Sequence, residues 1–218
     1  MDTPDPIATN VGPQAVAPAS ELDERTRTRL LRAAVQVFDR KGYAAASVRE
    51  IVEAAGVTKP ALYYHFGSKE GMLLAILHEG AREFEAAVER AVNRPGSARD
   101  RVRALAEDLY GLFAKNVPVV RVSHSVFHGP ANTAPMFDFT RFDRSLVAGL
   151  KQIVEAGQAA GELRPALPED VAMAVFGVIG ASVARQLHPE LEPVGVETLR
   201  RVIDLVFEGV LKDRRNKE

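Results

Sequence analysis

The chain has 218 residues, which is long enough for one large domain or two small domains with a hydrophobic core. Its 28 basic and 29 acidic residues give a net charge of −1, which excludes a uniformly basic protein that coats nucleic acid regardless of sequence. The absence of cysteine excludes a disulfide scaffold, a zinc–thiolate finger and a thiol nucleophile.

No segment is typical of a membrane protein or a secreted protein. The longest apolar stretch, residues 171–184, is too short to span a bilayer. The first 20 residues contain no lysine or arginine, so the basic start of a signal peptide is missing. We therefore expect a cytoplasmic protein with no membrane partner.

Residues 1–21 are predicted to form a disordered tail. They contain four prolines and no aromatic residue, so they have little to bury in exchange for the entropy of ordering. A role for this tail as an arm on DNA is disfavoured, because it carries Asp2 and Asp5 and no basic residue.

Beyond the tail, apolar residues recur with helical spacing through almost all of the chain. The first predicted helix ends at Gly42, a residue that readily adopts a left-handed conformation. Ser47 and Glu50 form a capping box that begins a short second helix, which Gly56 ends. Thr58 is the predicted N-cap of the third helix.

The rest of the chain repeats the same helical pattern. A long fourth helix is predicted from Ser68 to about Asn93. Further helices are predicted at residues 98–116, 118–128, 135–161, 169–187 and 196–212. Alternating β patterns are absent, so the predicted fold class is all-α with about nine helices.

The second and third helices are separated by a three-residue turn, 55–57, that contains a glycine, which is typical of a helix-turn-helix. Leu62 and Phe66 are four residues apart and are predicted to face the core. The side chains left to point outward, as phosphate ligands would, are Lys59, Tyr63, Tyr64 and His65. Residues 21–70 hold nine basic and seven acidic residues, so charge alone leaves open a solvated face with half-buried tyrosines.

A longer motif surrounds this turn and consists of Phe38, Gly42, Val48, Ile51, residues 55–57, Leu62, Tyr63, Phe66, Ser68, Lys69, Glu70 and Leu73. With this motif, residues 25–77 resemble the DNA-binding domain of the TetR family of bacterial regulators. The resemblance implies a three-helix helix-turn-helix domain at 22–68 and a connecting helix at 69–94. An effector-binding and dimerisation domain would then occupy residues 95–218.

The resemblance also implies roles for individual residues. It assigns DNA backbone contacts to Ser47 and Arg49, and it assigns the major groove to Thr58, Lys59 and Tyr64. It assigns phosphate binding to Tyr63, His65 and Lys69. Pro60 stands where many members have a small residue, and it offers no N–H group to a phosphate.

Half of the ten phenylalanines lie between residues 113 and 142, which favours an apolar ligand pocket. The predicted pocket residues are Tyr110, Phe113, Arg121, His124, Phe127, Phe137 and Phe142. The alternative that these phenylalanines form ordinary core remains open. His124 and His128 lie four residues apart without a third ligand nearby, so no metal or other cofactor is expected.

The family resemblance implies that the last two helices pair with their copies in a homodimer. Small residues among 171–184 would let helix backbones approach closely, and the final helix has a wide apolar stripe. The predicted dimer interface consists of Val178, Ala181, Arg185, Leu199, Val202 and Val206.

The predicted function is that of a DNA-binding transcriptional repressor that a small apolar or aromatic effector releases from a palindromic double-stranded DNA operator. Such a protein would be associated with the nucleoid through DNA. The alternative is an effector-independent DNA-bound protein that acts through a protein partner. An enzyme is not expected, because the sequence has no nucleophile–base pair, phosphate loop or metal cluster.

Overall fold

The computed structural model describes residues 19–209, apart from 131–132, 189 and 193. The predicted tail lies outside these residues except at its end, where Ala19 begins the first helix. Within the described residues the regular structure is wholly α-helical, which confirms the predicted fold class. The helices are α1 (Ala19–Lys41), α2 (Val48–Ala55), α3 (Lys59–Phe66), α4 (Lys69–Asn93), α5 (Ala98–Lys115), α6 (Val117–Phe127), α7 (Thr140–Ala159), α8 (Pro168–Leu187) and α9 (Val196–Glu208).

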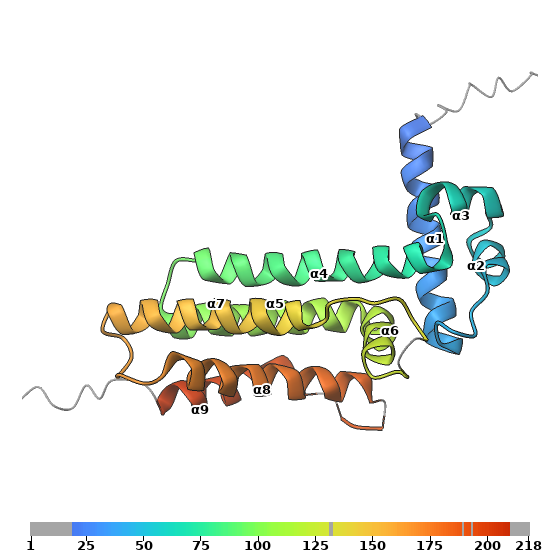
Figure 1. Ribbon diagram of the computed structural model, residues 1–218. Helices are drawn as coiled ribbons and strands as arrows, with labels where there is room; N and C mark the ends of the chain where they lie inside the picture. The colour runs from blue at the N-terminus through green and yellow to red at the C-terminus, as the bar shows by residue number, and fades with distance from the viewer. Residues whose placement is uncertain (1–18, 131–132, 189, 193, 210–218) are drawn as a thin grey trace, which may run out of the picture.

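The helices form two groups that α4 connects (Figure 1). The first three helices lie together at one end of the molecule, where α1 is roughly perpendicular to the long helices. The second group is a bundle in which α4, α5, α7, α8 and α9 run alongside one another. The short helix α6 lies where the two groups meet, in contact with α1 on one side and α8 on the other.

The first hydrophobic cluster holds the helix-turn-helix together. Phe38, Ile51 and Leu62 bring one buried side chain each from α1, α2 and α3. The cluster also takes in the first half of α4 and the buried Val122 of α6. Helix α6 therefore packs with the helix-turn-helix, although more than fifty residues separate the two in sequence.

The second hydrophobic cluster fills the bundle and takes buried residues from α4, α5, α7, α8 and α9. Helices α4 and α7 pack especially closely at Gly149, where a Cβ would lie 2.4 Å from Cγ1 of Val88. That distance is well inside the van der Waals limit, so the packing requires glycine at this position.

Helix α7 begins later than the sequence predicts. The expected start was near Pro135, whereas the helix begins at Thr140. The carboxylate of Asp138 accepts hydrogen bonds from Thr140 N at 3.1 Å and from Thr140 Oγ1 at 2.6 Å. Because the first N–H groups of a helix have no helical partner, this aspartate stabilises the observed start.

A group of partly buried ion pairs joins α5 to α9. Arg103 Nε donates to Asp204 Oδ1 at 2.6 Å, and Arg99 Nε donates to the same oxygen at 2.9 Å. These two guanidinium groups lower the pKa of Asp204 from its usual 3.8 to about 2. The Asp204 side chain is only 19% exposed, so solvent screens these pairs less than it screens surface pairs.

We predict that Asp204→Asn lowers the free energy of unfolding at pH 7 by about 1–2 kcal/mol, because two arginines lose their partner. The pKa is lower in the folded state, so the stabilisation is complete above about pH 4 and is lost as the pH falls through about 2. Urea titrations followed by circular dichroism at several pH values measure both effects.

The matched control is Asp108→Asn, which breaks an exposed pair with Arg90 at 3.7 Å. This variant should lose at most about 0.5 kcal/mol. The role given to Asp204 would be contradicted if both variants lost the same free energy of unfolding. It would also be contradicted if the difference between Asp204→Asn and the parent protein did not shrink at acidic pH.

Candidate DNA-binding surface and ligand cavity

Local interactions fix the two short helices of the helix-turn-helix. Ser47 Oγ accepts a hydrogen bond from Glu50 N at 3.3 Å, and Glu50 Oε2 accepts one from Ser47 N at 3.0 Å. These bonds confirm the predicted capping box at the start of α2. The helix ends at Gly56, whose φ of 61° lies in the left-handed region. The chain then turns into α3, with Thr58 as its N-cap residue.

Arg29 of α1 holds this turn in place, a role that the sequence analysis missed. Its Nη2 donates hydrogen bonds to the carbonyl oxygens of Ala55 at 2.6 Å and Gly56 at 3.0 Å. A Cβ at position 56 would lie 2.8 Å from that nitrogen. The left-handed backbone favours glycine at position 56, and a Cβ there would also displace the Arg29 guanidinium from these hydrogen bonds.

One face of α3 is buried and the other is open to solvent. Leu62 is fully buried, as the spacing predicts, whereas Tyr63 is 51% exposed and Tyr64 is 77% exposed. Six of the predicted DNA contacts are exposed, and they lie on α2, on α3 or at the residue just before each helix: Ser47, Arg49, Thr58, Lys59, Tyr63 and Tyr64. Helices α2 and α3 lie at the end of the molecule away from the bundle, so a large partner can reach this surface (Figure 1).

The structure corrects the prediction that His65 points outward. Its side chain is only 7% exposed, and its Nε2 lies 3.5 Å from Oδ1 of Asp23 in α1. The sequence spacing within α3 did not reveal this contact, because it depends on how α1 crosses α3. His65 therefore helps to fix α3 against α1.

Lys69, to which the resemblance assigns phosphate binding, has internal hydrogen-bond partners in this structure. Its Nζ donates hydrogen bonds to the carbonyl oxygens of Tyr43 at 2.9 Å and Ala46 at 2.8 Å. The ammonium group lies 4.4 Å from the centre of the Tyr43 ring, and partial burial lowers the pKa of Lys69. Lys69 thus fastens the loop between α1 and α2 to the start of α4.

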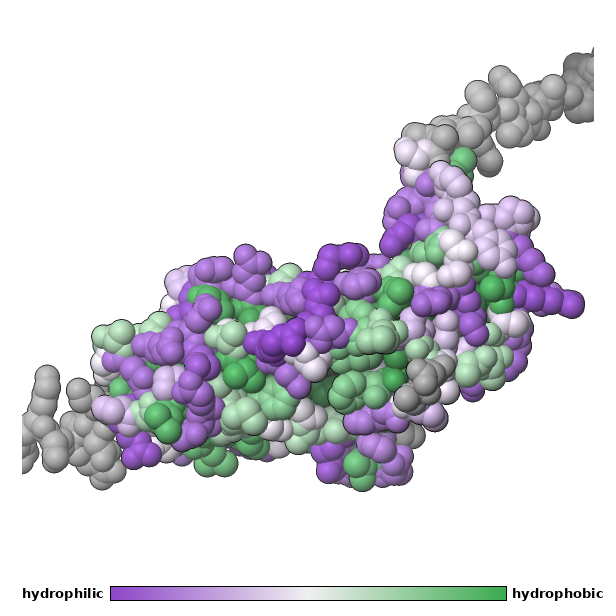
Figure 2. Space-filling view, viewed as in Figure 1, coloured by the Kyte–Doolittle hydropathy of each residue, from purple (hydrophilic) through white to green (hydrophobic). Residues whose placement is uncertain are grey.

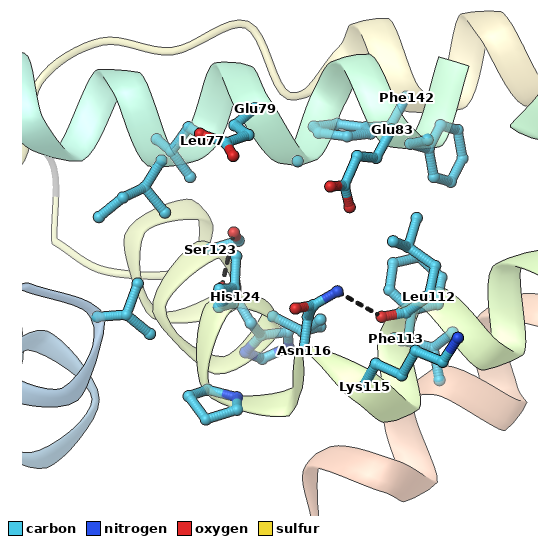
Figure 3. Close-up of a pocket in the computed structure, with 18 of the residues that line it drawn as sticks. Leu77, Glu79, Glu83, Leu112, Phe113, Lys115, Asn116, Ser123, His124 and Phe142 are labelled. Atoms are coloured by element: carbon cyan, nitrogen blue, oxygen red, sulfur yellow. Dashed lines mark hydrogen bonds between the residues drawn. The ribbon is translucent and has the colours of Figure 1, made fainter. Parts of the chain in front are cut away.

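A cavity of about 990 Å³ lies between the two groups of helices. Its walls come from α1, α4, α5, α6, α7 and α8. Figure 3 shows α4 on one side of the cavity and α6 on the opposite side. Four of the seven predicted pocket residues line it, namely Phe113, His124, Phe127 and Phe142. Phe84, Phe139 and Phe176 also line it, so its surface is largely aromatic and aliphatic.

The other three predicted pocket residues do not line the cavity, and each has a different partner. Tyr110 packs against the core of the bundle. Phe137 packs against the helix-turn-helix core, with its ring 5.2 Å from the ring of His78. Arg121 points to α1, where its Nε and Nη2 each donate to the Asp39 carboxylate at 2.7 Å.

The polar groups on the α6 side of the cavity already donate hydrogen bonds within the chain or carry no charge. Ser123 Oγ donates to Val119 O at 2.9 Å, and Asn116 Nδ2 donates to Leu112 O at 3.0 Å (Figure 3). Burial lowers the pKa of His124, so this imidazole is neutral at pH 7. In the part of the chain that the structure describes, no three acidic, histidine or cysteine residues gather as metal ligands would.

The small residues of α8 lie on an open face. A Cβ added at Gly177 or Gly180 would contact nothing within 4 Å, and Ala181 is exposed. Met173 of α8 is 56% exposed and Leu205 of α9 is 65% exposed. In Figure 2, apolar side chains reach the surface along the edge of the bundle where α8 and α9 lie.

Five of the six predicted interface residues remain at least partly accessible in the single chain, namely Val178, Ala181, Arg185, Val202 and Val206. Leu199 is 1% exposed within its own chain, which corrects its assignment to the dimer interface. Among the described helices, α8 is the one whose length and mean hydropathy of 1.3 would suit a membrane crossing. One of its sides, however, packs into the bundle core through Val171 and Ile179.

Residues 30–76 match the family described as bacterial regulatory proteins, tetR family. The transcriptional activator FasR of Mycolicibacterium smegmatis is 42% identical over 88 residues, which cover 40% of each chain. The transcriptional repressor KstR2 of the same organism is 30% identical over 161 residues, which cover 71% of this chain and 73% of KstR2.

The fold also matches that of solved structures. The transcriptional regulator FadR from Bacillus subtilis, solved in complex with stearoyl-CoA, superposes with a TM-score of 0.67 at 20% identity. The match covers 84% of this chain and 98% of FadR. The helix-turn-helix, the all-α bundle and the similarity to KstR2 over most of both chains lead to one assignment. The chain belongs to the TetR family, whose members are DNA-binding transcriptional regulators and not enzymes.

Proposed function

We propose that the protein is a homodimeric repressor that leaves a palindromic operator when a small apolar or aromatic molecule fills the cavity. One observation carries this proposal: the cavity is lined both by α1 of the helix-turn-helix domain and by helices of the bundle. A molecule in the cavity therefore contacts both parts that must move relative to each other. Such a protein acts in the cytoplasm, where its DNA lies.

Helix α6 provides a path from the cavity to the DNA-binding surface. His124 lies on the wall of the cavity, while Val122, two residues earlier, is buried in the helix-turn-helix core. Arg121 and Asp39 add a two-bond ion pair between α6 and α1. A displacement of α6 by a ligand would thus be transmitted to α1 through contacts that are already packed.

Helix α4 provides the second path. It begins directly after α3, and Phe84 near its middle lines the cavity. In a dimer, the tilt of α4 would set the distance between two recognition helices, which must match about 34–36 Å of DNA. A ligand can shift this geometry only by the difference in its affinity for the two conformations.

The face of α8 and α9 supports the proposed dimer. Exposed apolar side chains and the open Gly177 on α8 let a second copy approach closely and cover them. Because FasR is named an activator and KstR2 a repressor, the same architecture serves both outcomes in relatives. Our choice of repressor follows from the larger share of the chain that matches KstR2.

We predict that Tyr63→Phe lowers operator affinity about threefold to tenfold without changing sequence preference, because it removes one hydroxyl that binds phosphate. Tyr64→Ala, at the more exposed neighbouring position, should change which bases are preferred. Selection from randomised duplexes gives the preference, and fluorescence anisotropy gives the affinity. Tyr110→Phe, in the bundle, is the control and should change neither. If Tyr63→Phe changes base preference as much as Tyr64→Ala does, the proposed orientation of α3 is wrong.

We predict that Phe137→Ala and Phe127→Ala have different effects although they delete the same atoms. Phe137 packs on the helix-turn-helix core, so its loss should lower the free energy of unfolding by about 2–3 kcal/mol and weaken operator binding by the free protein. Phe127 lines the cavity and is 55% exposed, so its loss should leave operator affinity unchanged. Thermal unfolding and anisotropy measure the two quantities, and equal effects would contradict the division of the phenylalanines between core and cavity.

We predict that Ala181→Arg disrupts the dimer, because a guanidinium would be buried without a partner between two closely packed helices. Sedimentation equilibrium should then give a monomer or an aggregated chain. Ala114→Arg, at an exposed position on α5, is the control and should leave the dimer intact. A dimer that survives Ala181→Arg with unchanged melting would place the interface elsewhere.

A further inference from the structure

Two carboxylates of α4 lie on one wall of the cavity. Glu79 and Glu83 are one helical turn apart, and both side chains point into the cavity in Figure 3. The Glu79 side chain is 46% exposed as a whole, yet its Oε2 is buried and accepts no hydrogen bond from the residues that the structure describes. Buried polar atoms are almost always hydrogen-bonded, so this oxygen marks an incomplete interaction.

No donor of the cavity wall forms a hydrogen bond with this oxygen in the part of the chain that the structure describes. Across from Glu79, the Ser123 hydroxyl and the Asn116 amide already donate to backbone carbonyl oxygens, and His124 is neutral. The cation beside Glu79 is Arg27 of α1, whose Nη2 lies 3.8 Å from Oε2, beyond hydrogen-bond distance. The Arg27 guanidinium is also shared, since its Nη1 lies 3.6 Å from Glu24.

The remaining charges favour a positive ligand over a negative one. The cavity is lined by four carboxylates, Glu24, Glu79, Glu83 and Asp143, and by three cations, Arg27, Arg32 and Lys115. Lys115 lies on the side of the cavity opposite Glu83 (Figure 3). Two carboxylates one turn apart repel each other, and a cation between them relieves this repulsion.

The surrounding walls are suited to the same ligand. Phe113, Phe142 and Phe84, the residue that follows Glu83, line the same cavity, and aromatic faces attract cations as well as apolar groups. In such an apolar surrounding, a carboxylate is stabilised strongly by a partner that brings both a positive charge and an N–H group.

We propose that the effector is an organic cation, an apolar aromatic body that carries a protonated amine or amidine whose N–H groups bind Glu79 and Glu83. This inference rests on the proposed function, because it names the ligand of the same cavity. Binding places a second cation beside Arg27, whose guanidinium lies 5.8 Å from the centre of the Phe66 ring at the end of α3. The ligand charge therefore acts on a residue that contacts the recognition helix.

The test uses three probes that share one body and differ in their head group: 4-(biphenyl-4-yl)butan-1-amine, the matching alcohol and the matching carboxylic acid. Isothermal titration of the full chain without DNA should give an amine affinity at least about tenfold higher than that of the alcohol or the acid. Glu79→Gln should lower amine affinity at least about tenfold and leave alcohol affinity unchanged, which also shows that the cavity remains folded.

The control variant is Glu89→Gln, an exposed glutamate on the same helix outside the cavity. It should bind all three probes as the parent protein does. Equal affinities for the three head groups, a preference for the acid, absence of amine binding, or no effect of Glu79→Gln would each overturn the inference. Operator release is measured separately by anisotropy. Release by the acid or the alcohol would refute the cationic effector and uphold the proposed function. Amine binding without operator release would uphold the cation site and contradict the proposed function.

Discussion

The packing of α6 against the helix-turn-helix domain is the interaction on which the rest of the structure depends. Val122 is 1% exposed and lies in the same cluster as the side chains that hold α1, α2 and α3 together. The Arg121–Asp39 ion pair fixes the same helix to α1 from its exposed side. Without this contact, the helix-turn-helix would be joined to the bundle through α4 and the segment before α7, and the cavity would lose the wall that α6 forms.

This packing explains why the phenylalanine-rich segment serves two purposes. Phe137 and Phe139 pack against the helix-turn-helix core, whereas Phe113 and Phe142 pack against the core of the bundle. Their rings meet at the boundary, where Phe137 and Phe142 lie 6.2 Å apart. The cavity is the part of this boundary that side chains leave unfilled, so a ligand there contacts residues of both cores. In such an arrangement, ligand occupancy of the cavity can change the orientation of the helix-turn-helix domain directly through these packed side chains.

The sequence predicted features that depend on neighbouring residues. The capping box at Ser47, the glycine at the end of α2 and the burial of Leu62 follow from spacings of three or four residues. The helix-turn-helix and its exposed tyrosines followed from the same local patterns. These features account for the DNA-binding surface except at His65 and Lys69, whose partners lie on α1 and in the loop after it.

Apart from the start of α7, the features that were missed depend on contacts between distant segments. A row of phenylalanines reveals apolar character but not which core each ring joins, so Phe137 was placed in the cavity. Leu199 belongs to the apolar stripe of α9, and the packing of α9 on α5 and α8 decides that its own chain covers it. Glu79 and Glu83 were not predicted to be cavity residues, because their wall is completed by α6, more than thirty residues later.

Helix α6 is expected to respond to the state of the DNA-binding surface, and hydrogen exchange tests this coupling without any ligand. Helix α6 packs on α1 and is not part of the proposed DNA contact face. If the coupling is real, binding of a selected operator duplex should slow amide exchange in residues 117–127, and Asp39→Ala should reduce that protection. Protection confined to α1, α2 and α3, with α6 unchanged, would contradict the account.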